Sequence, residues 1–306
     1  MESEFEMNGN TYIVAGHPFV IRTGEDSLLR EELQFNYGPF VARTDPAEEV
    51  LFDLEAGLDG CWNDRGGRDL EPVYVAKSDP SEPVLNLYRD GKGWLVEMSP
   101  SGSMPTVAVL RTDESFGTGR VSYGDRRFGR FAIDNSAMLL FAFRTAVKGT
   151  LEMHSSVVEK DGRAYMFLAA SGTGKSTHSR MWLENIEGTT LLNDDNPIVR
   201  VMDDGSVRVF GSPWSGKTPC YLNSEAELGA MVLIRRSPEN RITEMSVPEA
   251  YACVSSSTSG FRPIEYMADG LHETISSIVL SKTCFVLDCR PDAEAAEICF
   301  RGVCGK

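Results

Sequence analysis

Residues 163–184 read RAYMFLAASGTGKSTHSRMWLE. The apolar segment from Tyr165 to Ala169 is typical of a buried strand, and it runs into a glycine-rich turn followed by a helical pattern. Gly172 and Gly174 lack a β-carbon, so the backbone can follow a tight path that turns successive N–H groups toward an anion. The start of the new helix adds its positive end. This stretch therefore predicts a strand, a phosphate-binding loop and a helix in succession.

The loop fits the pattern G-x-x-x-x-G-K-[ST] except at its first position, where Ala169 replaces glycine. We expect residue 169 to keep a negative φ, which alanine tolerates. Lys175 can place a positive charge against the β- and γ-phosphates of ATP, and the Ser176 hydroxyl can bind Mg²⁺. The alternative is a Gly/Ser-rich turn that only resembles a phosphate loop. The residues expected to bind the nucleotide are Ser171, Gly172, Thr173, Gly174, Lys175, Ser176 and Thr177.

A pair of acidic residues follows the loop in LLNDDNPIVRV, where Asp194 and Asp195 come directly after a short apolar run. An acidic residue at this distance beyond a phosphate loop often holds or orients its Mg²⁺. Neighbouring residues at a strand end project in different directions, so one carboxylate can face the metal and the other the acceptor. A solvated turn is the alternative, because N-D-D-N-P is rich in turn formers.

Composition excludes several classes of protein. The chain has 306 residues, 42% of them hydrophobic and 25% charged, which is typical of globular domains with a sizeable core. The net charge of −15 repels polyanions, so neither a nucleic-acid surface nor an anionic-lipid anchor is expected. Any nucleotide must be bound by local groups.

Targeting signals and cysteine usage favour a cytoplasmic protein. The acidic start MESEFEMNGN is not a secretory signal, and no apolar run reaches membrane-spanning length. The seven cysteines are scattered and never spaced C-x-x-C, which favours reduced thiols over a disulfide framework or a zinc site.

The chain changes character between its two parts. Residues 1–125 are expected to form a β-rich N-terminal domain, with a hairpin turn at 90–93 in VLNLYRDGKGWLVEM. A helix is expected to start at Asp134 as its N-cap and to end before Gly149. Beyond it, apolar runs alternate with helical stretches, which indicates an α/β domain over residues 126–306.

Four features in order resemble a known superfamily: MHSSVV at 153–158, Asp161-Gly162, FLAASGTGKST at 167–177 and the Asp194-Asp195 pair. They look like the HPr kinase/phosphorylase superfamily and its relative, ATP-dependent phosphoenolpyruvate carboxykinase. The resemblance covers roughly residues 130–306 and implies a carboxykinase-like P-loop nucleotide-binding core with ATP and Mg²⁺ as cofactors. A glycine- and arginine-containing stretch of true HPr kinases has no counterpart here, so HPr itself is not the expected substrate.

The resemblance also implies roles for individual residues. Lys175 would neutralise charge on the phosphates, and Ser176 and Asp195 would position Mg²⁺. Asp194 would accept the proton of the attacking hydroxyl, and His154 would hydrogen-bond near that acid. Phosphoryl transfer depends on alignment and charge compensation, so these residue types suit it. Which carboxylate faces the metal stays open.

Other candidates have weaker patterns. The segment FGSPWSGK at 210–217 resembles a loop of the kinase-like relatives, where Lys217 would reach a phosphate and Trp214 would cover a ligand; a hairpin connection is the alternative. Arg235 and Arg236 end an apolar run and are either solubilising charges or charge-stabilising groups. His178 is expected to be packed or solvent-facing.

These patterns predict a kinase that transfers the γ-phosphate of ATP to a hydroxyl acceptor, with a serine of a protein or peptide favoured over a small molecule. Two other functions remain open: a carboxykinase-type reaction, and a non-catalytic nucleotide-binding regulatory module. The partner is expected to be the hydroxyl substrate, with no nucleic acid and no membrane. Relatives often form oligomers, so a homo-oligomer is a further expectation.

Overall fold

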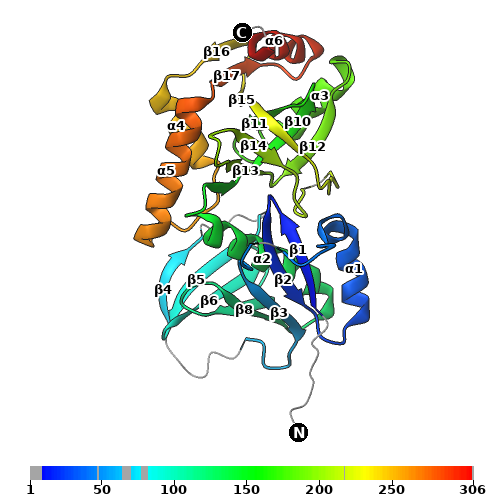
Figure 1. Cartoon of the computed structure of the whole chain (residues 1–306), viewed down its shortest axis with the longest axis vertical. Coiled ribbons are helices and arrows are strands. Elements are labelled where there is room, and N and C mark those ends of the chain that lie inside the picture. The colour runs from blue at the N-terminus through cyan, green and yellow to red at the C-terminus, as the bar shows by residue number, and fades with distance from the viewer. Residues whose placement is uncertain (1–8, 47, 64–69, 77–81, 217, 305–306) are drawn as a thin grey trace. The chain divides into compact units, whose positions relative to one another are not determined.

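The computed structural model describes residues 9–46, 48–63, 70–76, 82–216 and 218–304. Within these residues the chain is mixed α/β, with two large mixed sheets and six α-helices (Figure 1). Its contacts divide it into two compact units, Met1–Arg144 and Thr145–Lys306. The mixed α/β class is confirmed, whereas the carboxykinase-like core stays a prediction.

The described part of the first unit contains an eight-stranded sheet in the order β1-β2-β3-β8-β7-β6-β5-β4. Its strands are β1 (Gly9–Val14), β2 (His17–Arg22), β3 (Asp53–Leu58), β4 (Glu71–Val75), β5 (Val84–Asp90), β6 (Gly93–Ser99), β7 (Ala108–Thr112) and β8 (Thr118–Tyr123). Its helices are α1 (Ser27–Tyr37) and α2 (Gly129–Thr145), with short 3₁₀ turns at Gly38–Phe40 and Arg126–Phe128.

The expected hairpin of the first unit is confirmed. Strands β5 and β6 pair antiparallel with Asp90 opposite Gly93, so Gly91 and Lys92 form a two-residue turn. Gly91 has φ 61°, the left-handed conformation that such a turn requires.

The prediction that a helix starts at Asp134 is wrong, because α2 starts at Gly129. The 3₁₀ turn before it has Asp125 as its cap, whose side chain accepts from Arg127 N–H, and the chain passes from that turn directly into α2. Asp134 lies inside the helix and accepts a hydrogen bond from the side chain of Asn36. Phe141 of α2 packs edge-to-face on Phe19 of β2, so α2 belongs to the first unit, although its sequence suggested the second.

The described part of the second unit contains a nine-stranded sheet, with β12-β10-β11-β15-β14-β13-β9 as its main path and β17 and β16 added beside β15. Its strands are β9 (Thr150–Glu152), β10 (Ser155–Lys160), β11 (Arg163–Leu168), β12 (Thr190–Asp195), β13 (Ile198–Val201), β14 (Val207–Phe210), β15 (Glu225–Arg236), β16 (Arg241–Glu244) and β17 (Cys284–Cys289). Its helices are α3 (Lys175–Asn185), α4 (Val247–Ser256), α5 (Glu265–Ser281) and α6 (Ala293–Cys304).

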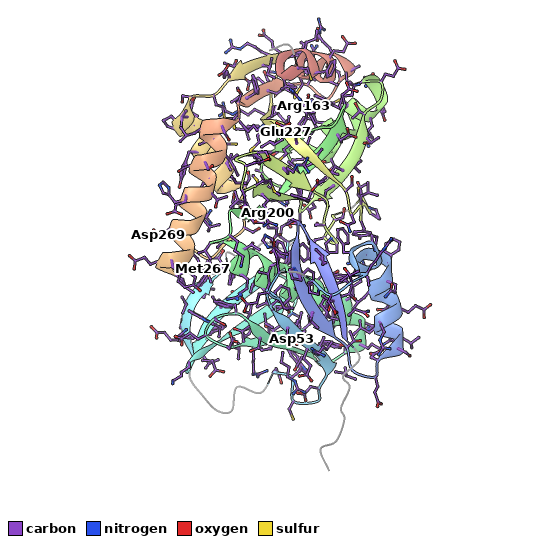
Figure 2. All side chains as sticks on the ribbon, viewed as in Figure 1. Asp53, Arg163, Arg200, Glu227, Met267 and Asp269 are labelled. Carbon is purple, nitrogen blue, oxygen red and sulfur yellow. The ribbon has the colours of Figure 1, made fainter. Side chains whose placement is uncertain are left out.

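Three neighbouring strands of this sheet, β11, β15 and β17, run parallel. Arg163 and Glu227, the first register partners of the β11–β15 pair, lie side by side (Figure 2). The opposite ends of the three strands therefore meet at one edge, where open α/β sheets usually bind ligands. The phosphate loop starts at this edge.

Helices α3 and α6 pack against each other and against the sheet. The core beneath them includes Phe167, Trp182 and Phe285, and the Trp182 ring lies between the rings of Phe167 and Phe300. This core fixes α3 and, with it, the end of the phosphate loop. Each helix in the described part of the chain falls short of the length and apolarity needed to cross a membrane.

Candidate functional site

The predicted strand, loop and helix are present. Strand β11 ends at Leu168, and α3 begins at Lys175. Gly172 and Gly174 have φ values of 71° and 129°, which explains why the loop needs glycine at both positions. Ala169 is not among the non-glycine residues with positive φ, as expected. No described side chain caps the start of α3 at Gly174, and the start of a helix is a position that favours an anion.

Lys175 is buried at the base of the loop, with 8% of its surface exposed. Its Nζ lies 2.8 Å from Nε2 of His154, and it also donates to the carbonyl of Ala169. On the other side of the ring, His154 Nδ1 lies 3.1 Å from Oδ1 of Asp195. A lysine ammonium has only donors, so Nε2 of His154 accepts and Nδ1 carries the hydrogen donated to Asp195. The structure thus joins Lys175, His154 and Asp195 in one chain of contacts.

Ser176 contacts the other carboxylate of the acidic pair. Its Oγ donates to Oδ1 of Asp194 over 2.9 Å, and only 4% of Asp194 is exposed. A serine hydroxyl and a carboxylate are oxygen ligands of the kind that Mg²⁺ prefers, and Mg²⁺ at phosphate sites usually keeps several water ligands and substrate oxygens. These two residues therefore fit a magnesium ion bound together with phosphate. No group of three or more His, Cys, Asp or Glu in the described residues is placed to bind a metal.

The acidic pair is held by two neighbouring segments. Strand β12 pairs antiparallel with β10, which places Ser155 opposite Asp195 and Ser156 opposite Asp194. On the other side, Gly216 N–H and Ser215 Oγ both donate to the carbonyl of Asp194. The expected 210–217 segment therefore positions the backbone of the acids.

Asp195 itself has φ 132°, a conformation that side-chain-bearing residues rarely adopt. Strained backbone of this kind persists only where surrounding contacts enforce it, and it is common at functional sites. Here the bridge to Ser215 and the contact with His154 enforce it.

Trp214 and Lys217 are the two residues of the 210–217 segment that were expected to contact a ligand. Trp214 is 3% exposed and its carbonyl accepts from Asn193, so its ring is packed inside the protein and does not form an exposed cover. Lys217, predicted to reach a phosphate, lies outside the described residues.

The two arginines at the end of β15 have different surroundings. Arg236 donates from Nη2 to the carbonyl of Gly172 over 2.6 Å and from Nε to that of Thr173 over 3.2 Å. Arg235, at the preceding position, is exposed as Arg236 is, and it makes no hydrogen bond to the loop among the described residues. Arg236 thus contacts the phosphate loop, although no pattern in the sequence distinguished it from Arg235.

The segment that contains Ser257 and Ser259 lies next to His154, although its sequence contains no motif that indicated a role in the site. The His154 N–H donates to the carbonyl of Ser257 over 2.7 Å, and the Ser259 N–H donates to that of Glu152 over 2.9 Å. Because directly opposed residues of an antiparallel pair share a face, Glu152, His154, Ser257 and Ser259 lie on one face. Glu152 is fully enclosed, and burial together with the nearby charge of Asp195 raises its pKa to about 8.

A cavity of about 560 Å³ lies beside the loop at the edge where the three parallel strands end. Gly174 and His178 line it from the start of α3, Arg236 from β15, and Cys289 and Arg290 from the end of β17. The sequence did not indicate this cavity, because its lining comes from α3, β15 and the end of β17, which only the folded chain brings together.

No protein-family model matches this sequence, and no curated protein is similar enough to it to be counted as a match.

Proposed function

We propose that residues 145–306 form an ATP-dependent kinase that transfers the γ-phosphate to a hydroxyl group, on a serine of a protein or peptide. The observation that supports this most is that the hydroxyl group of the phosphate loop contacts the acidic pair directly and its cationic group is linked to the pair through a histidine. Lys175 reaches Asp195 through His154, and Ser176 contacts Asp194 directly. ATP is the phosphate donor in this proposal, and Mg²⁺ is its companion ion.

The contact between His154 and Asp195 favours catalysis over nucleotide binding alone. A loop, a lysine and a serine would be enough to hold a nucleotide. The pair of His154 and Asp195 adds a carboxylate whose orientation is fixed by a hydrogen bond, as a general base requires. A regulatory module that only binds nucleotide would have no need for that pair.

The contacts favour an allocation of the two acids opposite to the one that the resemblance suggested. The carboxylate of Asp194 accepts a hydrogen bond from Ser176, so these two residues would hold Mg²⁺. When bound, the ion would supply charge compensation for the phosphates. Asp195 is left with His154 and has no other hydrogen bond from a described side chain. In this proposal Asp195 is the base and His154 orients it.

In the proposed phosphoryl transfer, one bond to the γ-phosphorus forms and one breaks. The acceptor hydroxyl oxygen forms a bond to the γ-phosphorus, its proton passes to the free oxygen of Asp195, and the bond from the γ-phosphorus to the β-phosphate oxygen breaks to release ADP. Lys175 and the N–H groups at the start of α3 compensate the charge of the phosphates throughout.

The resemblance to the HPr kinase-like superfamily supports a serine acceptor on a protein or peptide. It rests on MHSSVV, the loop and the acidic pair, in which residues 175, 154 and 195 form one chain of contacts and residues 176 and 194 form another. A carboxykinase reaction would require a dicarboxylate site, and no observation favours it.

The test is transfer of γ-labelled phosphate from Mg-ATP into a host lysate separated into proteins, peptides and small molecules. Wild-type protein should label a defined species, and Lys175→Ala should abolish that label because the phosphates lose their central charge. ATP labelled at the α-phosphate should leave the same species unlabelled. If ADP and ATP bind but no label moves into any fraction, the regulatory-module function is correct instead.

Two matched variants separate the acids. Asp195→Asn should retain Mg-ATP binding and lose transfer by about 100-fold or more, the usual contribution of a general base. Asp194→Asn should weaken Mg-ATP binding while leaving metal-free ATP binding near the wild-type value. The reverse pattern would return the base to Asp194 and the metal to Asp195.

A further inference from the structure

Residues 255–259, at the end of α4 and just beyond it, read SSSTS, so each of them carries a hydroxyl group. The hydroxyls of Ser256 and Thr258 donate to backbone carbonyls of α4. The hydroxyls of Ser257 and Ser259, in contrast, make no hydrogen bond with another described residue. Both residues are half-buried, and neither hydroxyl oxygen is sealed from solvent. These two hydroxyls are therefore not occupied by the fold.

An antiparallel bridge places this segment against the residues that carry His154. Met153 and Thr258 are the bridge partners, and at the next position the His154 N–H donates to the carbonyl of Ser257 over 2.7 Å. Opposed residues of an antiparallel pair project to the same face, with Cβ atoms about 5 Å apart. Ser257 therefore lies beside His154 on the face opposite to Met153.

His154 connects the two groups that the proposed phosphoryl transfer uses. Its Nδ1 lies 3.1 Å from Oδ1 of the proposed base, Asp195, and its Nε2 lies 2.8 Å from Nζ of Lys175. Ser257 is thus next to the ring that joins the phosphate-binding lysine to the base. A hydroxyl at this position is placed close to a γ-phosphate held by the lysine, and proximity of this kind favours transfer.

We propose that Ser257 is an acceptor of the γ-phosphate, so that the chain which binds ATP phosphorylates its own serine. The proposal rests on the proposed kinase function and names one acceptor for it. The Ser257 oxygen forms a bond to the γ-phosphorus, and its proton passes to the free oxygen of Asp195. The bond from the γ-phosphorus to the β-phosphate oxygen breaks and releases ADP. Mg-ATP supplies the phosphoryl group, and no further reactant is needed.

The surroundings favour Ser257 over Ser259 and suit the charge of the product. Ser259 lies opposite Glu152, because its N–H donates to the Glu152 carbonyl, and this places it two positions farther along the segment than the residue opposite His154. Arg262 donates from Nη2 to two carbonyls of residues 255–258, so a guanidinium already lies against the segment. A phosphoserine gains charge-assisted hydrogen bonds from such a group.

The test incubates the purified full chain with γ-labelled Mg-ATP and no other acceptor, and then locates the label by mass spectrometry of the peptides. Wild-type protein should take up the label at Ser257. The rate constant of uptake should stay the same when the protein is diluted about a hundredfold, because donor site and acceptor belong to one chain.

Three variants test the assignment to Ser257. Ser257→Ala should lose the label, and its melting by circular dichroism shows whether it is folded. Ser257→Thr keeps a hydroxyl and should still be labelled at position 257. Ser256→Ala is the matched control, because it removes the exposed hydroxyl one position away, and it should be labelled as the wild type is.

The outcomes separate this inference from the kinase proposal. Label at another residue, or equal labelling of Ser257→Ala and wild type, would overturn the assignment to Ser257. A rate constant that rises with protein concentration would show transfer between copies and would overturn self-phosphorylation within one chain. If wild-type protein labels a species of the host lysate but never itself, the kinase proposal stands and Ser257 is not an acceptor. If no label moves into the chain or into any lysate fraction, both proposals fail.

Discussion

Glu152 lies at the site and has a pKa far above the ordinary value of a glutamate. It is 2% exposed and lies two positions before His154 on the same face. Burial raises its pKa to about 8, with the charge of Asp195 as the smaller cause. We therefore expect Glu152 to be protonated at neutral pH and to leave Asp195 as the charged carboxylate beside His154.

This pKa makes stability depend on pH. The unfolded chain loses the Glu152 proton near pH 4.5, whereas the folded protein retains it up to about pH 8. Between these values the folded state binds one more proton, so wild-type stability falls as pH rises, by at most about 1.4 kcal/mol per pH unit. Glu152→Gln cannot ionise and should escape this loss, so its advantage over wild type should widen from pH 5 to pH 8. Urea unfolding at both pH values measures it, and an advantage independent of pH would contradict the raised pKa.

The phosphate loop is an element whose conformation depends on a distant strand. Arg236, at the end of β15, donates to the carbonyls of Gly172 and Thr173 and so fixes which way their peptide groups face. With those carbonyls held by a guanidinium, the loop is organised before any phosphate arrives. Pre-organisation of this kind reduces the entropy that binding would otherwise lose.

Arg236→Ala should therefore lower Mg-ATP affinity about five- to tenfold, which corresponds to roughly 1 kcal/mol of organisation and charge. Arg236→Lys keeps the charge but not the forked geometry, and it should recover less than half of that loss in free energy. The control is Arg235→Ala on the same strand, which should change affinity less than about twofold. Calorimetric titration measures all three variants, and equal effects of Arg235→Ala and Arg236→Ala would reduce the role of Arg236 to general charge.

Local patterns in the sequence predicted local structure well. The order strand, loop, helix around Gly172 and Gly174 follows from apolar periodicity and from glycine chemistry, and the turn at Gly91 follows from the same rules. The start of α2 was missed because Asp134 looks like a cap, whereas the preceding 3₁₀ turn at Arg126–Phe128 leads the chain into the helix earlier.

Contacts between distant segments could not be predicted. Arg236 meets the phosphate loop, and Ser257 meets His154, only because strands and a β-bridge bring them together. Pairing register and core packing are properties of the folded chain, so no local pattern indicates them.

The whole molecule carries a net charge of −15, which opposes the approach of an anionic nucleotide. In the proposed kinase, nucleotide binding would therefore depend on groups concentrated at one edge of the second sheet, namely Lys175, Arg236 and the start of α3. All of them, with both acids and the residues that line the cavity, lie within residues 145–306. The first unit contributes its own sheet and none of these groups.

This distribution predicts that Thr145–Lys306, expressed alone, folds and binds nucleotide. The unit has its own sheet and its own core around Phe167, Trp182 and Phe285, which is what independent folding requires. It should melt cooperatively by circular dichroism and bind Mg-ADP within about twofold of the full chain, since its binding groups are all present. Met1–Arg144 should fold without binding Mg-ADP.

If Thr145–Lys306 folds but binds Mg-ADP far more weakly than the full chain, the first unit must contribute to the nucleotide site. If Thr145–Lys306 binds Mg-ADP normally yet no longer transfers phosphate to the acceptor of the full chain, recognition of that acceptor belongs to the first unit.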